Sequence, residues 1–485
     1  MPEPPVAVVP NPFSWLLRAI GLAIAKLGLI SEQRARRTSE LAWPRIVTGV
    51  ARMSKSAADV AMVGVALGST AIAGVGFAGP YWGAAFSIGG GLAAGTIALV
   101  SQRFGAEAFD ELGQAIRSSV ALVVVVTVPV AAIFHLYPVA LISVLTDDPA
   151  AVRYGADYLR VVAFGVPFAG LNLIGSRALI GADDSWTAMV LRASGAVVNI
   201  GLNAVFIFGL DMGVVGAALG TVASNVVVVA AFAVGLTLGR LPGVGAFPVT
   251  VSPIGRYWHW GTCRDVVEIG LPVVGRNSVW TAARFPLLAF VGLFASPVVA
   301  AYIVTRRILG IMNTPGWGFG LAASSLVGQE LGRNDEKTAA SYGREIVVFS
   351  VATYVLFAAV VAVFARDIVV LFVESPNDPS VPIAVGMVYA AAVAVIPQGV
   401  NAASAGALDA TGDTRWPFYG RVLGMFGLAI PLVYLGATTR LGILGIYLSF
   451  FAESGVPAAV NYYRFATGKW KAISRSYRPD AAADD

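Results

Sequence analysis

The sequence predicts an all-α integral membrane protein with twelve transmembrane helices in two pseudo-symmetric six-helix bundles. Three observations lead to this prediction. Hydrophobic residues make up 57% of the 485 residues and charged residues only 13%, whereas soluble domains carry roughly 25% charged residues. Twelve stretches are long and apolar enough to cross about 30 Å of hydrocarbon. Motifs of the first half also recur in the second half at a near-constant spacing, which is typical of duplicated transporters.

The first element, within residues 1–40, is predicted to be an amphipathic segment and not a span. Residues 13–30, FSWLLRAIGLAIAKLGLI, approach spanning length, but Arg18 and Lys26 interrupt the apolar body and no small-residue cleavage site follows. Such a helix is expected to lie in the membrane interface, and it lacks the features of a signal peptide.

Twelve spans are expected after this segment. They lie near residues 41–66, 71–100, 115–136, 156–181, 186–209, 213–238, 265–293, 297–328, 344–372, 384–408, 415–436 and 441–466. Proline inside a span predicts a bent helix whose freed carbonyls are covered by neighbouring helices. Such prolines are Pro129, Pro167, Pro286, Pro315 and Pro431.

A repeat divides the chain into two lobes. Gln102 recurs as Gln329, 227 residues on, and Asp184 recurs as Asp413 at a spacing of 229. Since each half crosses the membrane an even number of times, both halves point the same way, and the axis that relates them lies along the membrane normal. We therefore expect an N-lobe at 41–240, a linker at 241–262, a C-lobe at 263–468 and a tail at 469–485.

Arginine and lysine cluster on one side of the predicted membrane: before the first span, after the second, sixth and eighth spans, and in the tail. The opposite side has little beyond Arg153 and Arg440. By the positive-inside rule, both termini are expected in the cytoplasm of a multi-pass cell-membrane protein. The net charge of +5 is interpreted as loops that face anionic lipid, so no nucleic-acid partner is expected.

Residue types that enzymes and metal centres need are scarce. With one cysteine, Cys263, and two histidines, the chain has neither an internal disulfide nor a Cys/His metal or nucleophile site. It also has no serine elbow and no acids paired at a useful spacing. We therefore expect no enzyme and no cofactor, and instead a monomeric transporter whose two bundles rock about a central cleft.

One acid lies within the first span, in the stretch SKSAADVAMVG at residues 54–64. An aspartate at the centre of a membrane helix costs about 2.5–3.5 kcal/mol on insertion scales, so Asp59 is expected to face protein or water. Either Asp59 binds the coupling cation, or it forms a structural pair with Lys55 one turn earlier. The first interpretation is the favoured one.

A second polar group lies in the fifth and sixth spans. Asn199 and Asn203 share one face of the fifth span, and Thr221 lies eight residues into the sixth. Near Asp59, their oxygens can form a proton-linked hydrogen-bond network or ligate sodium. They can equally hold helices together through amide and hydroxyl contacts. The residues alone leave both interpretations, and the choice between H+ and Na+, open.

In combination and order, these motifs resemble the multidrug and toxic compound extrusion (MATE) family over essentially the whole chain. The matching segments are LAWP at 41–44, GTIALVSQRFGA at 95–106, ALIGADDSW at 178–186, VVNIGLNAVFIFGLDMGVVGAALGT at 197–221, LGIMNTPGWGFGLAASSLVGQELGRND at 309–335 and AGALDATGDTRWP at 405–417. The resemblance implies the V-shaped MATE fold. It also implies a cation-coupled antiporter that exports organic, cationic or amphipathic compounds by alternating access.

The resemblance further implies residue roles in the N-lobe. Asp59 stands at the cation-coupling position of the branch that resembles DinF transporters, and Asn199, Asn203 and Thr221 match the polar cluster beside it, where a Na+ would bind. Some relatives have aspartate where Asn203 stands. Lys55 replaces a more usual aromatic or amide residue, and its charge favours the ionised form of Asp59.

The C-lobe departs from one sodium-coupled branch of the family. Ala282 and Gln398 stand where that branch has carboxylates, so its sodium site is not expected here. Instead, Arg284 and Glu453 are expected to meet, as a buried pair that holds helices together or as a pocket that tolerates anionic groups. Arg307 is expected to form a structural ion pair.

Aromatic and methionine side chains are the other candidates for the walls of a substrate cleft, because they suit flat organic cations. They are Met53, Met62, Trp82, Phe86, Trp280, Trp317 and Phe319. Ordinary packing or lipid contact is the alternative for each. The alternative function for the chain is a flippase for lipid-linked saccharides, since Arg52, Arg284 and Arg306 are suited to a pyrophosphate group.

Overall fold

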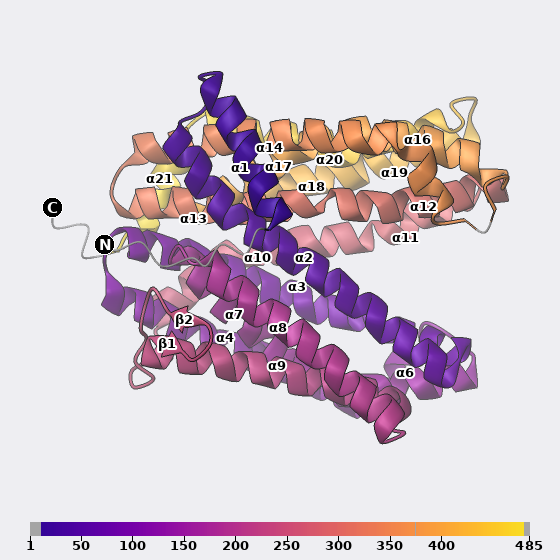
Figure 1. Ribbon diagram of the computed structural model, residues 1–485, viewed down its shortest axis with the longest axis horizontal. Helices are drawn as coiled ribbons and strands as arrows, with labels where there is room; N and C mark the ends of the chain where they lie inside the picture. The colour runs from indigo at the N-terminus through magenta and orange to yellow at the C-terminus, as the bar shows by residue number, and fades with distance from the viewer. Residues whose placement is uncertain (1–10, 374, 480–485) are drawn as a thin grey trace.

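The computed structural model describes residues 11–373 and 375–479, most of them helical (Figure 1). The first half contains α1 (Pro12–Lys26), α2 (Glu32–Leu67), α3 (Ser69–Gly105), α4 (Phe109–Leu136), α5 (Pro138–Ser143), α6 (Pro149–Val162), α7 (Gly165–Gly181), α8 (Ser185–Ala204) with a π-helical extension (Val205–Gly209), and α9 (Gly213–Leu238). A short hairpin of β1 (Arg240–Leu241) and β2 (Gly245–Ala246) follows.

The second half contains α10 (Trp260–Ala282), α11 (Arg284–Val291), α12 (Ser296–Met312), α13 (Thr314–Gly332), α14 (Glu336–Val363), α15 (Ala365–Val370), α16 (Ser380–Ala394) and α17 (Ile396–Ala410). It continues with α18 (Arg415–Val422), a π-helical stretch (Leu423–Ala429), α19 (Ile430–Thr438), α20 (Leu444–Ala466), α21 (Trp470–Ser474) and a 3₁₀ turn (Arg475–Tyr477).

Every predicted span is helical, although several consist of two helices. Within the described residues, seven helices are long and apolar enough to cross a membrane alone, and α6 with α7, which meet at 52°, make an eighth. The other predicted spans carry more charge, as α2 does, or are split into shorter helices, as α12 and α13 are. For that reason, these spans are not single long apolar helices.

Prolines mark several of the splits. The α10–α11 break comes just before Pro286, the α12–α13 break just before Pro315, and the α6–α7 bend just before Pro167. Pro431 begins α19 directly after a π-helical stretch, which is a known way to absorb a proline. Pro129, in contrast, lies inside α4, which is continuous from Phe109 to Leu136.

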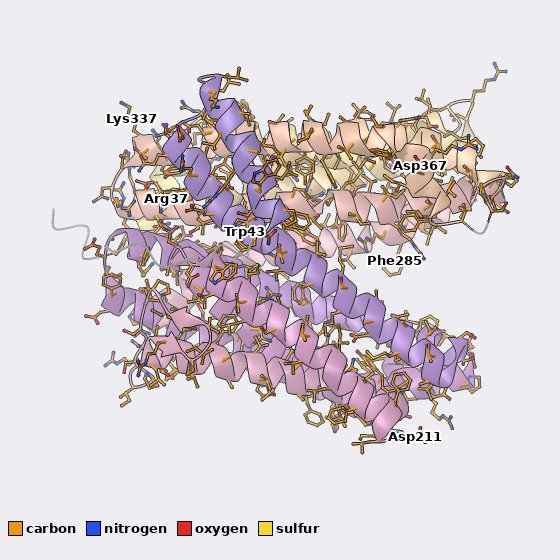
Figure 2. All side chains as sticks on the ribbon, in the orientation of Figure 1. Arg37, Trp43, Asp211, Phe285, Lys337 and Asp367 are labelled. Carbon is orange, nitrogen blue, oxygen red and sulfur yellow. The ribbon has the colours of Figure 1, made fainter. Side chains whose placement is uncertain are left out.

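The two halves form two lobes that meet at one end of the molecule and diverge towards the other (Figure 1). We call these the closed end and the open end. Arg37 and Lys337 lie at the closed end, and Asp211 and Asp367 lie towards the open end of the N-lobe and the C-lobe (Figure 2). This is the V-shaped arrangement that the resemblance implied.

The glycines of α3 show where the two lobes are in contact. A Cβ added at Gly91 would lie 2.7 Å from the carbonyl oxygen of Gly270 in the C-lobe, and one at Gly105 would lie 1.9 Å from that of Gln329. Gly76 and Gly83 are on the same face of α3 as Gly90, yet nothing lies within 4 Å of an added Cβ at either. The lobes are therefore in contact along the closed half of α3 and apart along its open half.

The N-terminal helix and the tail both pack at the periphery. α1 contacts α2 and α14 and buries Leu17, Gly21 and Ile24, while Trp15 on its other side is 71% exposed. α1 therefore touches a helix of each lobe. Trp470 of α21 is stacked on Phe465 of α20, which holds the start of the tail against the C-lobe.

Candidate functional site

One face of α2 carries a polar stripe into the N-lobe. Arg45, Arg52 and Asp59 are spaced by seven residues, close to two helical turns, so they lie on the same face of α2. Lys55 lies between the last two, one turn before Asp59. α2 packs along α8, which brings this stripe to the asparagines of α8.

Asp59 lies beside the three residues that the sequence grouped with it. Asn203 Nδ2 donates to Asp59 Oδ1 at 2.7 Å and lies 3.4 Å from Asn199 Oδ1. Asn199 Nδ2 donates in turn to Thr221 Oγ1 at 3.2 Å. Both asparagines are fully buried, and Thr221 is 4% exposed. The structure thus brings α2, α8 and α9 together through one chain of hydrogen bonds.

Two further residues shape this cluster and were missed in the sequence. A Cβ at Gly220 would lie 1.9 Å from Asn203 Oδ1, so a side chain there would displace the asparagine that reaches Asp59. Tyr158 of α6 lies close enough to Asp59 and Thr221 to interact with both side chains. Neither has a sequence signal of its own, because each acts through spatial contact with residues from another helix.

The ionic state of Asp59 in this structure follows from its neighbours. Lys55 Nζ lies 3.4 Å from Asp59 Oδ2, and the two side chains are 24% and 21% exposed. The carboxylate therefore has an ammonium on one oxygen and an amide NH2 on the other, which suits its ionised, acceptor-only form. A sodium ion needs oxygen ligands, so Asn203 would have to turn its amide to ligate one.

The C-lobe holds a separate cluster around Glu453, and one expectation about it was wrong. Glu453 Oε2 is paired with Arg306 Nη1 at 2.6 Å, not with Arg284. Arg284 instead stacks on Trp280 at 3.7 Å from the ring centroid, and Trp280 Nε1 lies 3.3 Å from Glu453 Oε1. The aromatic face of Trp280 occupies Arg284, so the carboxylate is left to the arginine of α12.

A second correction concerns Arg307. It is exposed and makes no ion pair within residues 11–373 and 375–479, although a structural pair was expected. Its neighbour Arg306 points to the interior in its place, because adjacent helical residues face directions about 100° apart. A pair that was not expected joins Arg276 of α10 to Asp409 of α17 at 2.8 Å.

The predicted cleft residues do not form one surface. Trp82 and Phe86 line a pocket inside the N-lobe, while Trp317 of the C-lobe lies under Arg52, 5.1 Å from its ring centroid. Met53 is 37% exposed, and Met62 packs on the N-lobe cluster around Val63. Trp280, Arg284 and Glu453 belong to the C-lobe cluster described above. Phe319 was misplaced, since it is fully buried against Phe349 in the C-lobe core.

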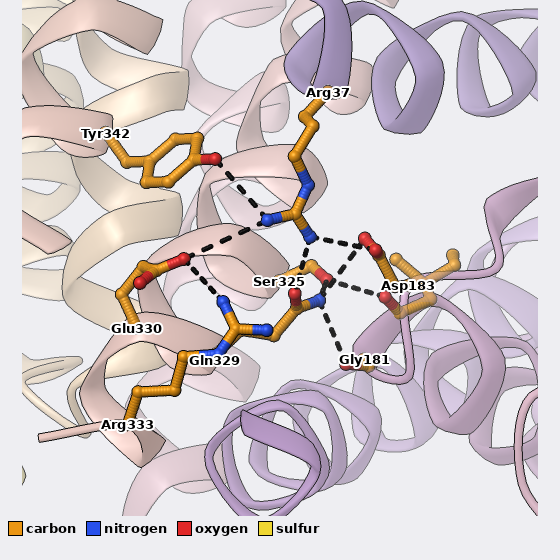
Figure 3. A network of polar contacts seen from close by, with 9 residues as sticks. Arg37, Gly181, Asp183, Ser325, Gln329, Glu330, Arg333 and Tyr342 are labelled. Atoms are coloured by element: carbon orange, nitrogen blue, oxygen red, sulfur yellow. Dashed lines mark hydrogen bonds and ion pairs between the residues drawn. The ribbon is translucent and has the colours of Figure 1, made fainter. Parts of the chain in front are cut away.

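At the closed end, polar contacts join the two lobes (Figure 3). Arg37 Nη2 of the N-lobe lies 2.8 Å from Asp183 Oδ2 and 2.9 Å from Gln329 Oε1 of the C-lobe. It also reaches the Tyr342 hydroxyl and lies 3.9 Å from Glu330. Gln329 Nε2 contacts the carbonyl of Gly181, so α13 is tied back to the end of α7. Entry from this side requires these contacts to break.

The repeat places a second contact of the same kind on the other side of the pseudo-symmetry axis. Gln102 Nε2 of α3 donates to the carbonyl of Ala410 at 2.7 Å, and Gln102 and Gln329 are equivalent positions of the repeat. Their partner carbonyls, at Gly181 and Ala410, are also equivalent, 229 residues apart. Each lobe therefore reaches the other with the same glutamine.

Two acids beside this closure sit outside the spans and have shifted pKa values. Burial raises the pKa of Asp184, against the bonds that Thr187 donates to it. Burial also raises the pKa of Asp413, its repeat mate, against the Arg464 guanidinium at 2.5 Å. Both carboxylates are thus held by local partners and not by the opposite lobe.

Comparisons with known proteins agree with this architecture. The family model described as MatE matches residues 44–205 and 272–435. The probable multidrug resistance protein NorM of Rhodopseudomonas palustris is 27% identical over 443 residues, which are 88% of this chain and 90% of that protein. The probable multidrug resistance protein YoeA of Bacillus subtilis is 23% identical over 441 residues, which are 89% of this chain and 94% of that protein.

A solved structure shows the same fold. A multidrug resistance MATE family transporter of the MOP superfamily, in an outward-facing conformation, matches with a TM-score of 0.80 at 21% identity. The match covers 91% of this chain and 96% of that one.

Proposed function

Because the chain belongs to the MatE family, we propose that it is an ion-coupled exporter of organic compounds, cationic or amphipathic, across the cell membrane. Its relatives carry names of multidrug resistance proteins, which supports a broad range of small organic substrates. The observation that carries the proposal is the buried chain of Asp59, Asn203, Asn199 and Thr221 in the N-lobe.

Coupling requires that the ion and the substrate favour different states of the protein. Asp59 suits this role because it is the one acid of its cluster, and because its charge is held by partners that can exchange. When a cation binds the carboxylate, the bonds from Lys55 and Asn203 lose their anionic acceptor. The cluster then has a reason to rearrange, and α2, α8 and α9 are the helices that would move with it.

Alternating access is the second part of the proposal. The closed end carries the arginines and lysines that point to the cytoplasm by the positive-inside rule. On that assignment, both termini are cytoplasmic and the structure is in an outward-open state. The contacts of Arg37, Gln102 and Gln329 form the barrier that must open for a compound to enter from the cytoplasm.

Transport of a fluorescent organic cation into everted membrane vesicles tests the proposal. The vesicles receive either a proton or a sodium gradient, and the ion that drives uptake identifies the coupling ion. The proposal expects uptake that collapses when an ionophore dissipates the driving gradient. Uptake that is absent with both gradients, or that is indifferent to both, would contradict it.

The alternative function, a flippase for lipid-linked saccharides, is favoured by one observation. Arg52 and Arg284 lie against aromatic rings and have no carboxylate partner among the described residues. A flippase would move a labelled pyrophosphate lipid between leaflets of a proteoliposome, and it would leave the fluorescent cation untouched. The same vesicle preparation therefore separates the two functions.

A further inference from the structure

Four arginines gather in the closed half of the N-lobe without a counter-charge. Arg45 and Arg52 come from α2, Arg177 from α7 and Arg192 from α8. The charge of Arg45 is close enough to feel the other three. None of the four makes an ion pair with a carboxylate in the part of the chain that the structure describes. Only Arg52 among them drew attention in the sequence.

Their donors are also largely unsatisfied. Nε and Nη1 of Arg45 and Nη1 of Arg192 are buried and have no hydrogen-bond partner in the described residues. Arg177 has only the hydroxyl of Ser176, at 3.4 Å. A buried donor without a partner costs about 1–3 kcal/mol, and more when it is charged. Such an arrangement is unfavourable unless another group supplies acceptors.

Aromatic rings compensate part of the charge. Trp317 of the C-lobe lies 5.6 Å from Arg45 and 5.1 Å from Arg52, and Phe86 lies 5.5 Å from Arg52. A cation above a ring face is stabilised through the ring and not through its N–H groups. The rings therefore hold the two guanidinium groups in place and leave their N–H donors for a further partner.

A pocket lies beside Arg45, the one member of the four that lines it. It is lined by Arg45, Thr48 and Ser185 together with Ser176, Ile180, Ala188 and Met189. It lies directly inside the closure of the closed end, since Arg37 is two turns before Arg45 on α2 and Asp183 is two residues before Ser185. A group that enters when the closure opens would meet Arg45 first.

We propose that this cluster of four arginines, reached through the pocket at Arg45, binds a phosphate group, carried either by a lipid headgroup or by a soluble phosphorylated compound. Guanidinium groups match phosphate because their planar N–H forks bond its oxygens two at a time. A phosphate offers several oxygens and up to two negative charges, enough to satisfy donors from three helices at once. A single chloride or one carboxylate would leave most of these donors unbonded.

The site goes beyond the proposed export function and does not depend on Asp59. It adds an anion to a part of the N-lobe in which, of the four arginines and Lys55, only Lys55 has a carboxylate partner among the described residues. Its test uses equilibrium binding with no gradient. Binding can therefore fail while gradient-driven export persists, and export can fail while binding persists.

The test uses the full chain in phosphatidylcholine nanodiscs with two probes. Inorganic pyrophosphate is titrated by calorimetry against sodium chloride of equal ionic strength. In parallel, native mass spectrometry measures the retention of phosphatidic acid against phosphatidylcholine. Binding of pyrophosphate assigns the site to a soluble phosphorylated compound, and selective retention of phosphatidic acid assigns it to a lipid headgroup. Either outcome supports the proposal.

Variants tie the binding to the cluster. Arg45→Gln and Arg192→Gln are each expected to weaken binding by about tenfold or more, as loss of a charged hydrogen bond does. Arg366→Gln, at an exposed arginine of the C-lobe, is the matched control and should bind as the wild type does. Both cluster variants should fold, and their melting temperature without ligand should rise, because a repelling buried charge is removed.

Either of two results would overturn the proposal. Neither probe would bind beyond the chloride and phosphatidylcholine controls, or both cluster variants would bind as tightly as the wild type. Either result would leave the arginines without a phosphate ligand.

Discussion

At the residue scale, the carboxylate of Asp59 is paired with a neighbour that the sequence already placed beside it. Lys55 lies 3.4 Å away on the same face of α2, and Asn203 completes the contact from α8. The chain of bonds then passes through Asn199 to Thr221. A change in the charge of Asp59 on α2 therefore reaches α8 and α9 through three hydrogen bonds.

Lys55→Ala separates coupling from a purely structural ion pair. In a coupling role, export should survive and its pH dependence should move upward, since the carboxylate without its ammonium partner takes up a proton more easily. In a structural role, removal of Lys55 would strand a buried charge and lower the melting temperature along with export. Initial rates of dye export across a pH series measure the first outcome, with Lys337→Ala, at an exposed lysine, as the control.

Glu453 is expected to contribute to stability through Arg306. The two side chains are only 15% and 20% exposed and lie 2.6 Å apart. Glu453→Gln leaves the arginine without its charge partner, which costs about 3–5 kcal/mol for a buried pair. The melting temperature should therefore fall. The double variant Arg306→Met with Glu453→Met should recover most of it, because well-packed apolar residues can replace a buried pair. A single variant as stable as the wild type would contradict the assignment.

At the element scale, the crossing of α3 and α13 forms the closure. Gly105 and Gly332 are equivalent positions of the repeat, and each lies against the backbone of the opposite helix. A Cβ at Gly105 would lie 1.9 Å from the carbonyl oxygen of Gln329, and one at Gly332 would lie 1.8 Å from that of Gln102. Small residues let membrane helices approach this closely. Backbone atoms on the partner side cannot move away as a flexible side chain can.

Gly105→Ala should weaken the closure without harm to either lobe. Overpacking costs about 1–3 kcal/mol, and each 1.4 kcal/mol lowers the population of the closed contact about tenfold. Amide hydrogen exchange of residues 101–106 and 328–333 should accelerate accordingly. Gly79→Ala on the same helix is the control, because nothing lies within 4 Å of its added Cβ. Equal exchange in both variants would argue against a tight contact at Gly105.

The tail adds a pH-dependent contact at the same end. Glu336 at the start of α14 accepts bonds from Arg475 at 2.7 Å and Arg478 at 2.9 Å. The bond from Arg475 lowers the pKa of Glu336 below its ordinary value of 4.5. Because its pKa is lowered, the ionised carboxylate of Glu336 stabilises the docked tail above about pH 4.5. This contribution is lost as the pH falls through the lowered pKa.

Limited proteolysis of the tail measures this contact. Cleavage within residues 469–479 should be slow at neutral pH and should accelerate severalfold at a pH below the lowered pKa of Glu336. Glu336→Gln should cleave fast already at neutral pH, whereas Glu107→Gln, at an exposed loop position, should not. A tail of Glu336→Gln that resists cleavage as the wild type does would refute the role of this acid.

At the scale of the whole molecule, the sequence predicted more of the fold than of the site. Span lengths, the repeat of Gln102 in Gln329 and the even number of crossings were enough for two lobes and their common orientation. These features depend on hydrophobicity and chain order, which a sequence displays directly. The partner of Glu453 could not be predicted in this way, because it depends on which arginine side chain faces inward. Arg284 stacks on the ring of Trp280, and Arg306 forms the ion pair with Glu453.

The cluster of Asp59, Asn199, Asn203 and Thr221 could be predicted from the sequence. Asn199 and Asn203 have helical spacing, and all four residues match positions of the MATE family. The cluster of four arginines could not be predicted, since Arg45, Arg177 and Arg192 come from three helices and no single stretch of sequence shows them together. Gly220 and Tyr158 are hidden for the same reason. Contacts between helices distant in sequence remain the part that only the structure displays.

The central claim is that the carboxylate of Asp59 couples an ion gradient to export. Gradient-driven transport of a fluorescent organic cation, measured in proteoliposomes with Asp59→Asn beside Asp211→Asn, tests it most directly. Asp59→Asn keeps the size of the side chain and removes a charge, so the variant should insert and fold at least as stably as the wild type. The account predicts that gradient-driven export is lost in Asp59→Asn and retained in Asp211→Asn, whose position is exposed at the open end of the N-lobe (Figure 2). Undiminished gradient-driven export by Asp59→Asn would contradict it.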